Sequence, residues 1–118
     1  MSTPVGPYTP VVRTGDFVIT SGQIGIENGK LVEGGLAAEL DQAMRNLADV
    51  LAQEGATLAD VVKTTVFLTD MADYAEMNER YTAALGDHRP ARSAVAVAAL
   101  PIGACVEIEA WAVAPKGA

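Results

Sequence analysis

The sequence is poor in the residue types from which many catalytic and structural sites are built. Its 118 residues include one cysteine, one histidine, two phenylalanines, three tyrosines and one tryptophan. The single cysteine, Cys105, excludes a disulfide within the chain. An ordinary zinc site of cysteines and histidines is excluded as well, because it needs more of these ligands than the chain contains. With so few aromatic side chains, the core must be built from Val, Ile, Leu and Ala.

Positive charge is also scarce. Eight Lys and Arg against fifteen Asp and Glu give a formal net charge of −7. This balance repels phosphate backbones and anionic lipids, which argues against nucleic acids and membranes as partners. No apolar run approaches the ~20 residues of a membrane span, and the first residues show no charged leader segment. We therefore predict a cytoplasmic protein with a single domain over residues 1–118.

What the chain does contain is a clear alternation of helical and strand patterns. An apolar stripe through residues 36–51 recurs every three or four residues, which predicts an amphipathic helix that stops near Gly55. A second stripe through residues 71–85 predicts another helix, capped by Asp70 and ended by Gly86. Strand patterns, rich in β-branched residues, cover residues 11–13, 17–21, 61–68, 93–100 and 104–113, with shorter candidates at 23–26 and 30–32.

Two helices can cover only one face of a sheet of five or six strands, so the last strand indicates what the other face bears. Alternate residues from Val106 to Ala112 are apolar and point one way. The opposite face combines two carboxylates with Trp111 and Cys105. This mixture is typical neither of a hydrophobic core nor of a fully solvent-exposed surface. We infer that this face meets another subunit and leaves a polar cleft at the junction.

Nucleotide-binding glycine motifs are absent, and the candidates for chemistry are an arginine and two glutamates. Arg92 follows Pro90-Ala91 and opens a strand, so it could grip a carboxylate with two parallel hydrogen bonds. The alternative is a surface arginine that pairs with an acid of the chain. Glu107 and Glu109 share one strand face, where a carboxylate could activate water beside a bound imine. The alternative is a pair of solvated carboxylates.

The remaining polar candidates each have an ordinary structural explanation. Tyr8 could donate a hydrogen bond or simply anchor the N-terminal arm by packing, and Ser21 could be a turn-forming hydroxyl. Asn78 could cap or bridge rather than bind a ligand. The lone His88 is expected to be a solvated loop residue, and Cys105 a half-buried packing residue rather than a nucleophile.

Taken together, several short motifs resemble the Rid (reactive intermediate deaminase, YjgF-type) family from about residue 6 to residue 113. Each motif is weak alone, but they occur in order and near the family spacing. They are Gly6-Pro7-Tyr8, Ser21-Gly22-Gln23-Ile24, Asn46-Leu47, the run from Asp60 to Leu68, Asn78 with Tyr81, Pro90-Ala91-Arg92-Ser93, Leu100-Pro101 and the run from Val106 to Ala110.

The resemblance implies an α+β, chorismate-mutase-like fold with a mixed sheet of five or six strands and two helices on one face. It implies a homotrimer with clefts between subunits. The implied activity is hydrolysis of reactive 2-imino acids, or their enamine tautomers, to 2-keto acids and ammonia. No cofactor or metal is expected, and the implied partner is a small imino or keto acid that carries a carboxylate.

The resemblance also assigns roles to individual residues. Arg92 would hold the substrate carboxylate, and Glu107 would position the attacking water and assist proton transfer. Many active members have Cys two residues after the arginine, where this chain has Ala94, which can still offer its backbone groups. The remaining residues implied to bind substrate are Tyr8, Ser21, Gly22 and Asn78.

Other functions remain open at the level of sequence. The chain could be a non-catalytic trimer that binds small carboxylates or keto acids as a sensor or regulator. It could be a hydrolase restricted to one catabolic intermediate. An RNA-directed or holdase role is a further alternative, against which the net charge of −7 argues. The physiological substrate and the effect of Ala94 stay open.

Overall fold

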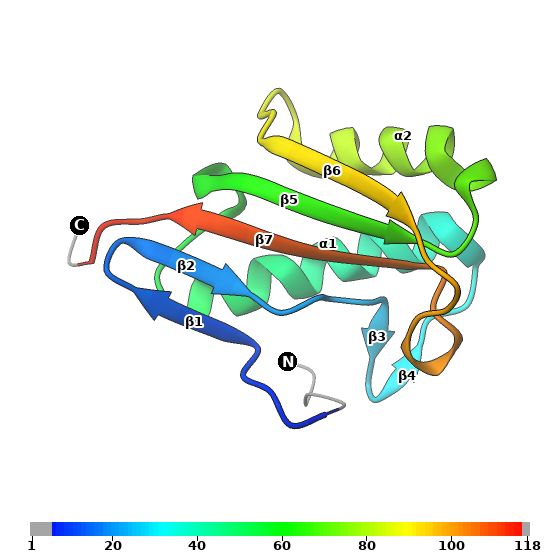
Figure 1. Ribbon diagram of the computed structural model, residues 1–118, viewed down its shortest axis with the longest axis horizontal. Helices are drawn as coiled ribbons and strands as arrows, with labels where there is room; N and C mark the ends of the chain where they lie inside the picture. The colour runs from blue at the N-terminus through cyan, green and yellow to red at the C-terminus, as the bar shows by residue number, and fades with distance from the viewer. Residues whose placement is uncertain (1–5, 117–118) are drawn as a thin grey trace.

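The computed structural model describes residues 6–116, which fold as two helices packed on one face of a mixed sheet (Figure 1). The predicted N-terminal arm therefore lies partly outside the described residues. The sheet has five strands in the order β1-β2-β7-β5-β6, and all neighbours are antiparallel except β5 and β6. The strands are β1 (Val11–Thr14), β2 (Phe17–Thr20), β5 (Val61–Leu68), β6 (Ala91–Ala96) and β7 (Val106–Val113).

The core lies between this sheet and helices α1 (Gly35–Gln53) and α2 (Tyr74–Leu85), as the helical stripes predicted. Leu40, Leu47 and Leu51 of α1 are fully buried. Each such side chain contributes roughly 1.5–3 kcal/mol through burial of its apolar surface. Gly55 has a φ of +77°, a left-handed conformation that favours glycine and lets the chain turn away after α1. No helix of the described residues is long and apolar enough to cross a membrane.

The alternation predicted for the last strand is confirmed. Val106, Ile108, Ala110 and Ala112 of β7 are buried under the helices, whereas the residues between them face the uncovered side of the sheet. This uncovered side is here called the open face. It extends over all five strands, with β7 in the middle. Exposed Phe17 and Trp111 contact each other there with ring centroids 5.9 Å apart.

Several predicted strands differ in length from the observed ones. The strand expected at 93–100 is β6, which ends at Ala96; Val97 donates one last hydrogen bond to the Leu68 carbonyl, and β5 offers no partner beyond that point. The strand expected at 23–26 is reduced to one bridge, between Gln23 and Ile108. A separate two-stranded ladder, β3 (Ile26–Glu27) and β4 (Lys30–Leu31), follows it.

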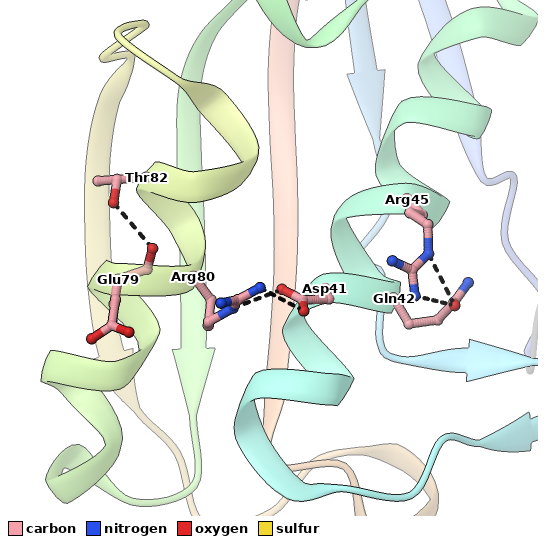
Figure 2. Close-up of polar contacts among 6 residues, drawn as sticks. All are labelled: Asp41, Gln42, Arg45, Glu79, Arg80 and Thr82. Carbon is pink, nitrogen blue, oxygen red and sulfur yellow. Dashed lines mark hydrogen bonds and ion pairs between the residues drawn. The ribbon is translucent and has the colours of Figure 1, made fainter.

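The two helices are tied to each other on the outer surface (Figure 2). Arg80 of α2 donates from Nε and Nη2 to the two carboxylate oxygens of Asp41 of α1, at 3.0 and 2.8 Å. Arg45 donates instead to Gln42 within α1. A groove of about 360 Å³ is lined by these two arginines, by Asp41 and by apolar side chains, namely Met44, Leu58 and three alanines of the two helices. This surface lies on the opposite side of the molecule from the open face.

Candidate functional site

The first group of predicted site residues lies on the open face, where the segment after β2 crosses the start of β7. The main chain of Gln23 pairs with Ile108 through two hydrogen bonds of 2.7 and 2.9 Å. This pairing lays the backbone of Gly22 directly against the side chain of Glu107. A Cβ atom added at residue 22 would lie 2.4 Å from Glu107 Oε2, so only glycine leaves room for the carboxylate in this position.

Ser21 belongs to the same group, and its hydrogen bonds fix the chain segments next to Gly22. The Ser21 amide donates to the Pro10 carbonyl at 2.8 Å, which fixes the N-terminal arm beside the strand. The Ser21 hydroxyl accepts a long hydrogen bond of 3.3 Å from the Gln23 side chain. Tyr8 is an exposed residue of this arm, with 44% of its surface accessible. The structure therefore places Gly22 against Glu107, with Ser21 next to Gly22 in the chain.

Glu107 is the titratable group of this cluster whose pKa is shifted from its ordinary value. Half-burial disfavours its charged form and raises the pKa of its carboxyl above the ordinary value, and the nearby charge of Glu109 raises that pKa further. No ion pair to Glu107 occurs among residues 6–116. A carboxylate with a raised pKa is a stronger base than an ordinary glutamate, which suits it to accept a proton from water near neutral pH.

Arg92 lies at the edge of the sheet, on β6, and its side chain points to the helix-covered face. Register with β5 places it opposite the buried Thr64. Its guanidinium carbon lies 5.0 Å from the ring centroid of Tyr81 and 5.6 Å from that of Tyr74. Nη2 donates to the Tyr74 hydroxyl at 3.0 Å, and Nη1 donates to the Met77 sulfur at 3.6 Å.

These partners leave the charge of Arg92 without a counterion. The ion pairs within the described part of the chain join Arg13 to Glu54 and Arg80 to Asp41. Arg92 instead has a phenol and a thioether, and a thioether is a weak acceptor. In a chain of net charge −7, an arginine without an acidic partner is suited to bind an external anion.

Ala94 and Asn78 belong to the surroundings of Arg92. Ala94 follows Arg92 on the same face of β6 and is half-buried opposite Val66. Asn78 lies one turn from Tyr74 and Tyr81 on α2, on the flank that faces β6. Its Oδ1 atom is buried and has no hydrogen-bond partner, which is uncommon for a buried polar atom.

The structure does not bring Arg92 and Glu107 together within one chain. Arg92 points to the helix-covered face at one edge of the sheet, whereas Glu107 points to the open face of β7. The cause is the alternation of side chains along paired strands: Glu107 is opposite Phe67 on β5, whereas Arg92 is opposite Thr64, three residues away and on the other face. A site that uses both residues needs two copies of the chain.

The two less favoured nucleophile and base candidates lie elsewhere. His88, expected to be solvated, is instead half-buried, and its Nε2 lies 2.7 Å from the Val61 carbonyl oxygen, which fixes the loop. Cys105 is half-buried, as predicted, and burial, assisted by a hydrogen bond with Glu39, raises the pKa of its thiol to about 12. Among residues 6–116, no group of three or more His, Cys, Asp or Glu side chains could hold a metal ion.

One residue of the Arg92 surroundings was missed at the level of sequence. Tyr74 was assigned to the apolar stripe of the second helix, yet its hydroxyl contacts Arg92 and its side chain is partly exposed. The signal that could have found it is the spacing of Tyr74 and Tyr81 on one side of a helix that precedes the arginine strand.

Comparison with known proteins gives consistent matches over nearly the whole chain. The family model described as Endoribonuclease L-PSP matches residues 1–114. The 2-iminobutanoate/2-iminopropanoate deaminase of Mus musculus is 45% identical over 111 residues, which is 92% of this chain and 82% of that protein. A RutC family protein of Pyrococcus abyssi is 41% identical over 111 residues, covering 92% and 87% of the two chains.

Solved structures agree with the fold. RidA from the Antarctic bacterium Psychrobacter sp. PAMC 21119 superposes with a TM-score of 0.90 at 42% identity, covering 94% of this chain and 91% of that chain. Yeast Mmf1 superposes with a TM-score of 0.90 at 36% identity, covering 94% and 90%.

Proposed function

We propose a function from the premise that this chain belongs to the YjgF/RidA family. The proposed activity is hydrolytic deamination of small 2-imino acids, or their enamine tautomers, to 2-keto acids and ammonia, without a cofactor. Three relatives at 43–45% identity bear the name 2-iminobutanoate/2-iminopropanoate deaminase, which supports this reaction class. We also propose that the protein acts as a homotrimer, in the cytoplasm.

The single observation that carries the proposal is the unpaired Arg92. A 2-imino acid has a carboxylate next to its reacting C=N carbon. The guanidinium of Arg92 has five N–H donors, of which one is engaged by the neutral hydroxyl of Tyr74 and one by the weakly accepting sulfur of Met77. Three donors are therefore left, enough for the two parallel hydrogen bonds of a carboxylate.

The proposed reaction is an addition followed by an elimination. Water attacks the carbon of the protonated imine, R–C(=NH₂⁺)–COO⁻, as Glu107 accepts a proton from that water. The same proton then goes to the nitrogen of the carbinolamine. As the C–N bond breaks and NH₃ leaves, the carbinolamine hydroxyl gives its proton to the Glu107 carboxylate and forms the C=O bond, and the departing NH₃ takes that proton from Glu107. The products are R–C(=O)–COO⁻ and NH₄⁺, so atoms and charge balance. Arg92 contributes by fixing the carboxylate, and with it the reacting carbon, beside the water.

Because Arg92 and Glu107 face opposite sides of one sheet, the proposed site combines Arg92 of one copy with Glu107 of another. The open face offers a surface for this contact, since Phe17, Val95 and Trp111 are exposed on it beside the carboxylates. The description of the matching family model names an endoribonuclease. A net charge of −7 gives little attraction for RNA phosphates, so we do not propose that activity here.

The activity is tested by generating 2-iminopropanoate and 2-iminobutanoate in situ with an amino-acid oxidase and following their capture by semicarbazide. The wild-type protein should suppress semicarbazone formation, whereas Arg92→Ala should not. Arg89→Ala is a matched control, because Arg89 is an exposed arginine whose guanidinium donates to the carbonyls of Gly86 and His88 and forms no ion pair with residues 6–116. Binding of keto acid by wild type without any suppression would favour the non-catalytic binder instead.

The sharing of one site between copies is tested by mixing two inactive variants. Arg92→Ala and Glu107→Gln chains with different tags are co-expressed, and assemblies that contain both tags are purified. In a mixed trimer, about one interface in three combines an intact Arg92 with an intact Glu107, so about a third of wild-type activity should return. In a mixed dimer about half should return. No recovery would refute a site that combines Arg92 of one copy with Glu107 of another.

A further inference from the structure

The guanidinium of Arg92 is held between two aromatic rings that differ in how firmly they are fixed. Tyr81 is buried, and its hydroxyl lies 2.8 Å from the hydroxyl of Thr64 on β5. Tyr74 is 39% exposed and contacts the guanidinium through both its ring and its hydroxyl. We propose that Tyr74 is a positioning residue, which sets the orientation of the Arg92 guanidinium for a substrate carboxylate; this rests on the function proposed above.

The position of Tyr74 is itself well defined by the chain before it. Asp70 accepts a hydrogen bond of 2.9 Å from the Ala72 amide and so caps the short turn that follows β5. That turn, Met71–Asp73, leads directly into α2, of which Tyr74 is the first residue. The main chain of Tyr74 therefore follows directly from the end of β5, the strand that pairs with β6, so the Cα positions of Tyr74 and Arg92 are set by the same pair of strands.

The two contacts of Tyr74 constrain different motions. A ring beside the guanidinium resists movement of the cation away from the aromatic face, through the cation–π attraction. The hydroxyl, as an acceptor for Nη2, resists rotation within the guanidinium plane. A bidentate carboxylate contact depends on both, because two parallel hydrogen bonds require one plane and one direction. The hydroxyl engages a single donor and so leaves a pair of donors for the ligand.

A structural role alone does not account for Tyr74. Its partly exposed ring adds little to the core, and the contact with Nη2 lies at the surface. The anchoring is done by Tyr81, Met77 and Leu85, which α2 buries against the sheet. Replacement of Tyr74 should consequently change the orientation of Arg92 while it leaves the stability of the fold nearly unaltered.

The test compares Tyr74→Phe, which removes only the hydroxyl, with Tyr74→Leu, which removes the aromatic ring. Arg92 binds the substrate carboxylate with similar strength in the ground state and in the transition state. A misoriented guanidinium should therefore raise KM more than it lowers kcat. We expect Tyr74→Phe to raise KM for the 2-imino acid about fivefold, with kcat within about twofold, and Tyr74→Leu to raise it more. Thr82→Ala, which removes from the same helix a hydroxyl that donates to the Glu79 carbonyl, is the control and should change neither constant.

A double-mutant cycle tests whether Tyr74 acts through Arg92. In an Arg92→Lys background, which keeps the charge but loses the planar fork, Tyr74→Phe should have almost no further effect on kcat/KM. An equal effect in both backgrounds, or an unchanged KM for Tyr74→Phe, would overturn the proposal.

Failure of the proposed activity is distinguished by direct binding of 2-oxobutanoate, followed by calorimetry. If wild type shows no turnover but binds this keto acid, and Tyr74→Phe weakens binding several-fold, the deaminase function fails while the positioning role stands. If wild type is active but Tyr74→Phe matches it in turnover and binding, the positioning role alone is wrong. If wild type neither reacts nor binds, both proposals fall.

Discussion

The position of Glu107 can be tested by comparing alanine substitutions at Gly22 and Gly25. The added methyl group would clash with side-chain atoms at residue 22 and with backbone atoms at residue 25. Neither Gly22 nor Gly25 has a positive φ, so alanine adds no backbone strain at either position. At residue 22, the new Cβ would lie 2.4, 2.6 and 2.8 Å from three side-chain atoms of Glu107. At residue 25, it would lie 2.7 Å from both the Cα and the carbonyl oxygen of Glu39, which are backbone atoms of α1.

The expected consequence at Gly22→Ala is a loss of activity without a loss of stability. Carbon atoms make ordinary contact at about 3.5–4.0 Å, so the Glu107 carboxylate must move by roughly 1 Å or more. The side chain is flexible and half-exposed, so this move should cost less than about 1 kcal/mol of folding free energy. Misplacement of a catalytic base by this distance should lower kcat/KM about 100-fold.

Gly25→Ala should do the opposite. The backbone of α1 cannot swing aside, so the clash must be absorbed by separation of α1 from the loop at a cost of about 1–3 kcal/mol. The thermal midpoint should fall by several degrees, while the active fraction that remains folded keeps its kcat. The two variants are compared by the semicarbazide assay and by thermal denaturation. Full activity of Gly22→Ala would refute the placement of Glu107 as the base, and equal destabilisation by both variants would refute the argument from side-chain flexibility.

Four further predictions concern charge and the thiol. Since the charge of Glu109 helps raise the pKa of Glu107, Glu109→Gln should move the acidic limb of the kcat/KM profile to lower pH, and an unmoved limb would dismiss that coupling. In the separated chain, the folded state binds the Glu107 proton more tightly than the unfolded state does, so ionisation weakens folding as pH rises from about 4.5 to the raised pKa. Glu107→Gln should therefore raise the melting temperature of the separated chain above that window and not below it. Asp41→Asn should lower the melting temperature slightly by breaking the Arg80 pair, and the difference should shrink in about 1 M salt, measured by scanning calorimetry. With a pKa of about 12, the Cys105 thiol should react with iodoacetamide far more slowly at pH 8 than free cysteine does, as followed by mass spectrometry.

Local sequence patterns were sufficient for the elements but not for their arrangement. The stripe through residues 36–51 predicts α1, since helical spacing and burial coincide there. The alternation from Val106 to Val113 correctly predicts a strand with one buried face and one mixed face. Nothing in these patterns indicates that the last strand lies between the second and the fifth, because strand order is decided by pairing between segments distant in sequence. The length of β6 depends in the same way on where its neighbour ends.

The site was predicted as a set of residues, and its geometry was not. Gly22 and Glu107 do meet, and the family motifs that contain them lie on adjacent segments. The face to which Arg92 points could not be read from β6 itself, since small residues such as Ala91, Ser93 and Ala94 give that strand no hydrophobic alternation. Only the register with β5 places Arg92 beside the helices.

The separation of Arg92 and Glu107 within one chain gives an electrostatic reason for the proposed assembly. Among residues 6–116 of one chain, Glu107 is a half-buried carboxylate with a raised pKa that forms no ion pair, and Arg92 is a cation that forms none either. Each group is already fixed by its own chain, Glu107 against Gly22 and Arg92 between two rings, so assembly needs little reordering. Approach of Arg92 from a second copy would favour the charged form of Glu107 and lower its pKa. The acidic limb of the kcat/KM profile against pH should therefore lie below the pKa that Glu107 has in the separated chain. The basicity of Glu107 would then depend on whether Arg92 of a second copy is in place.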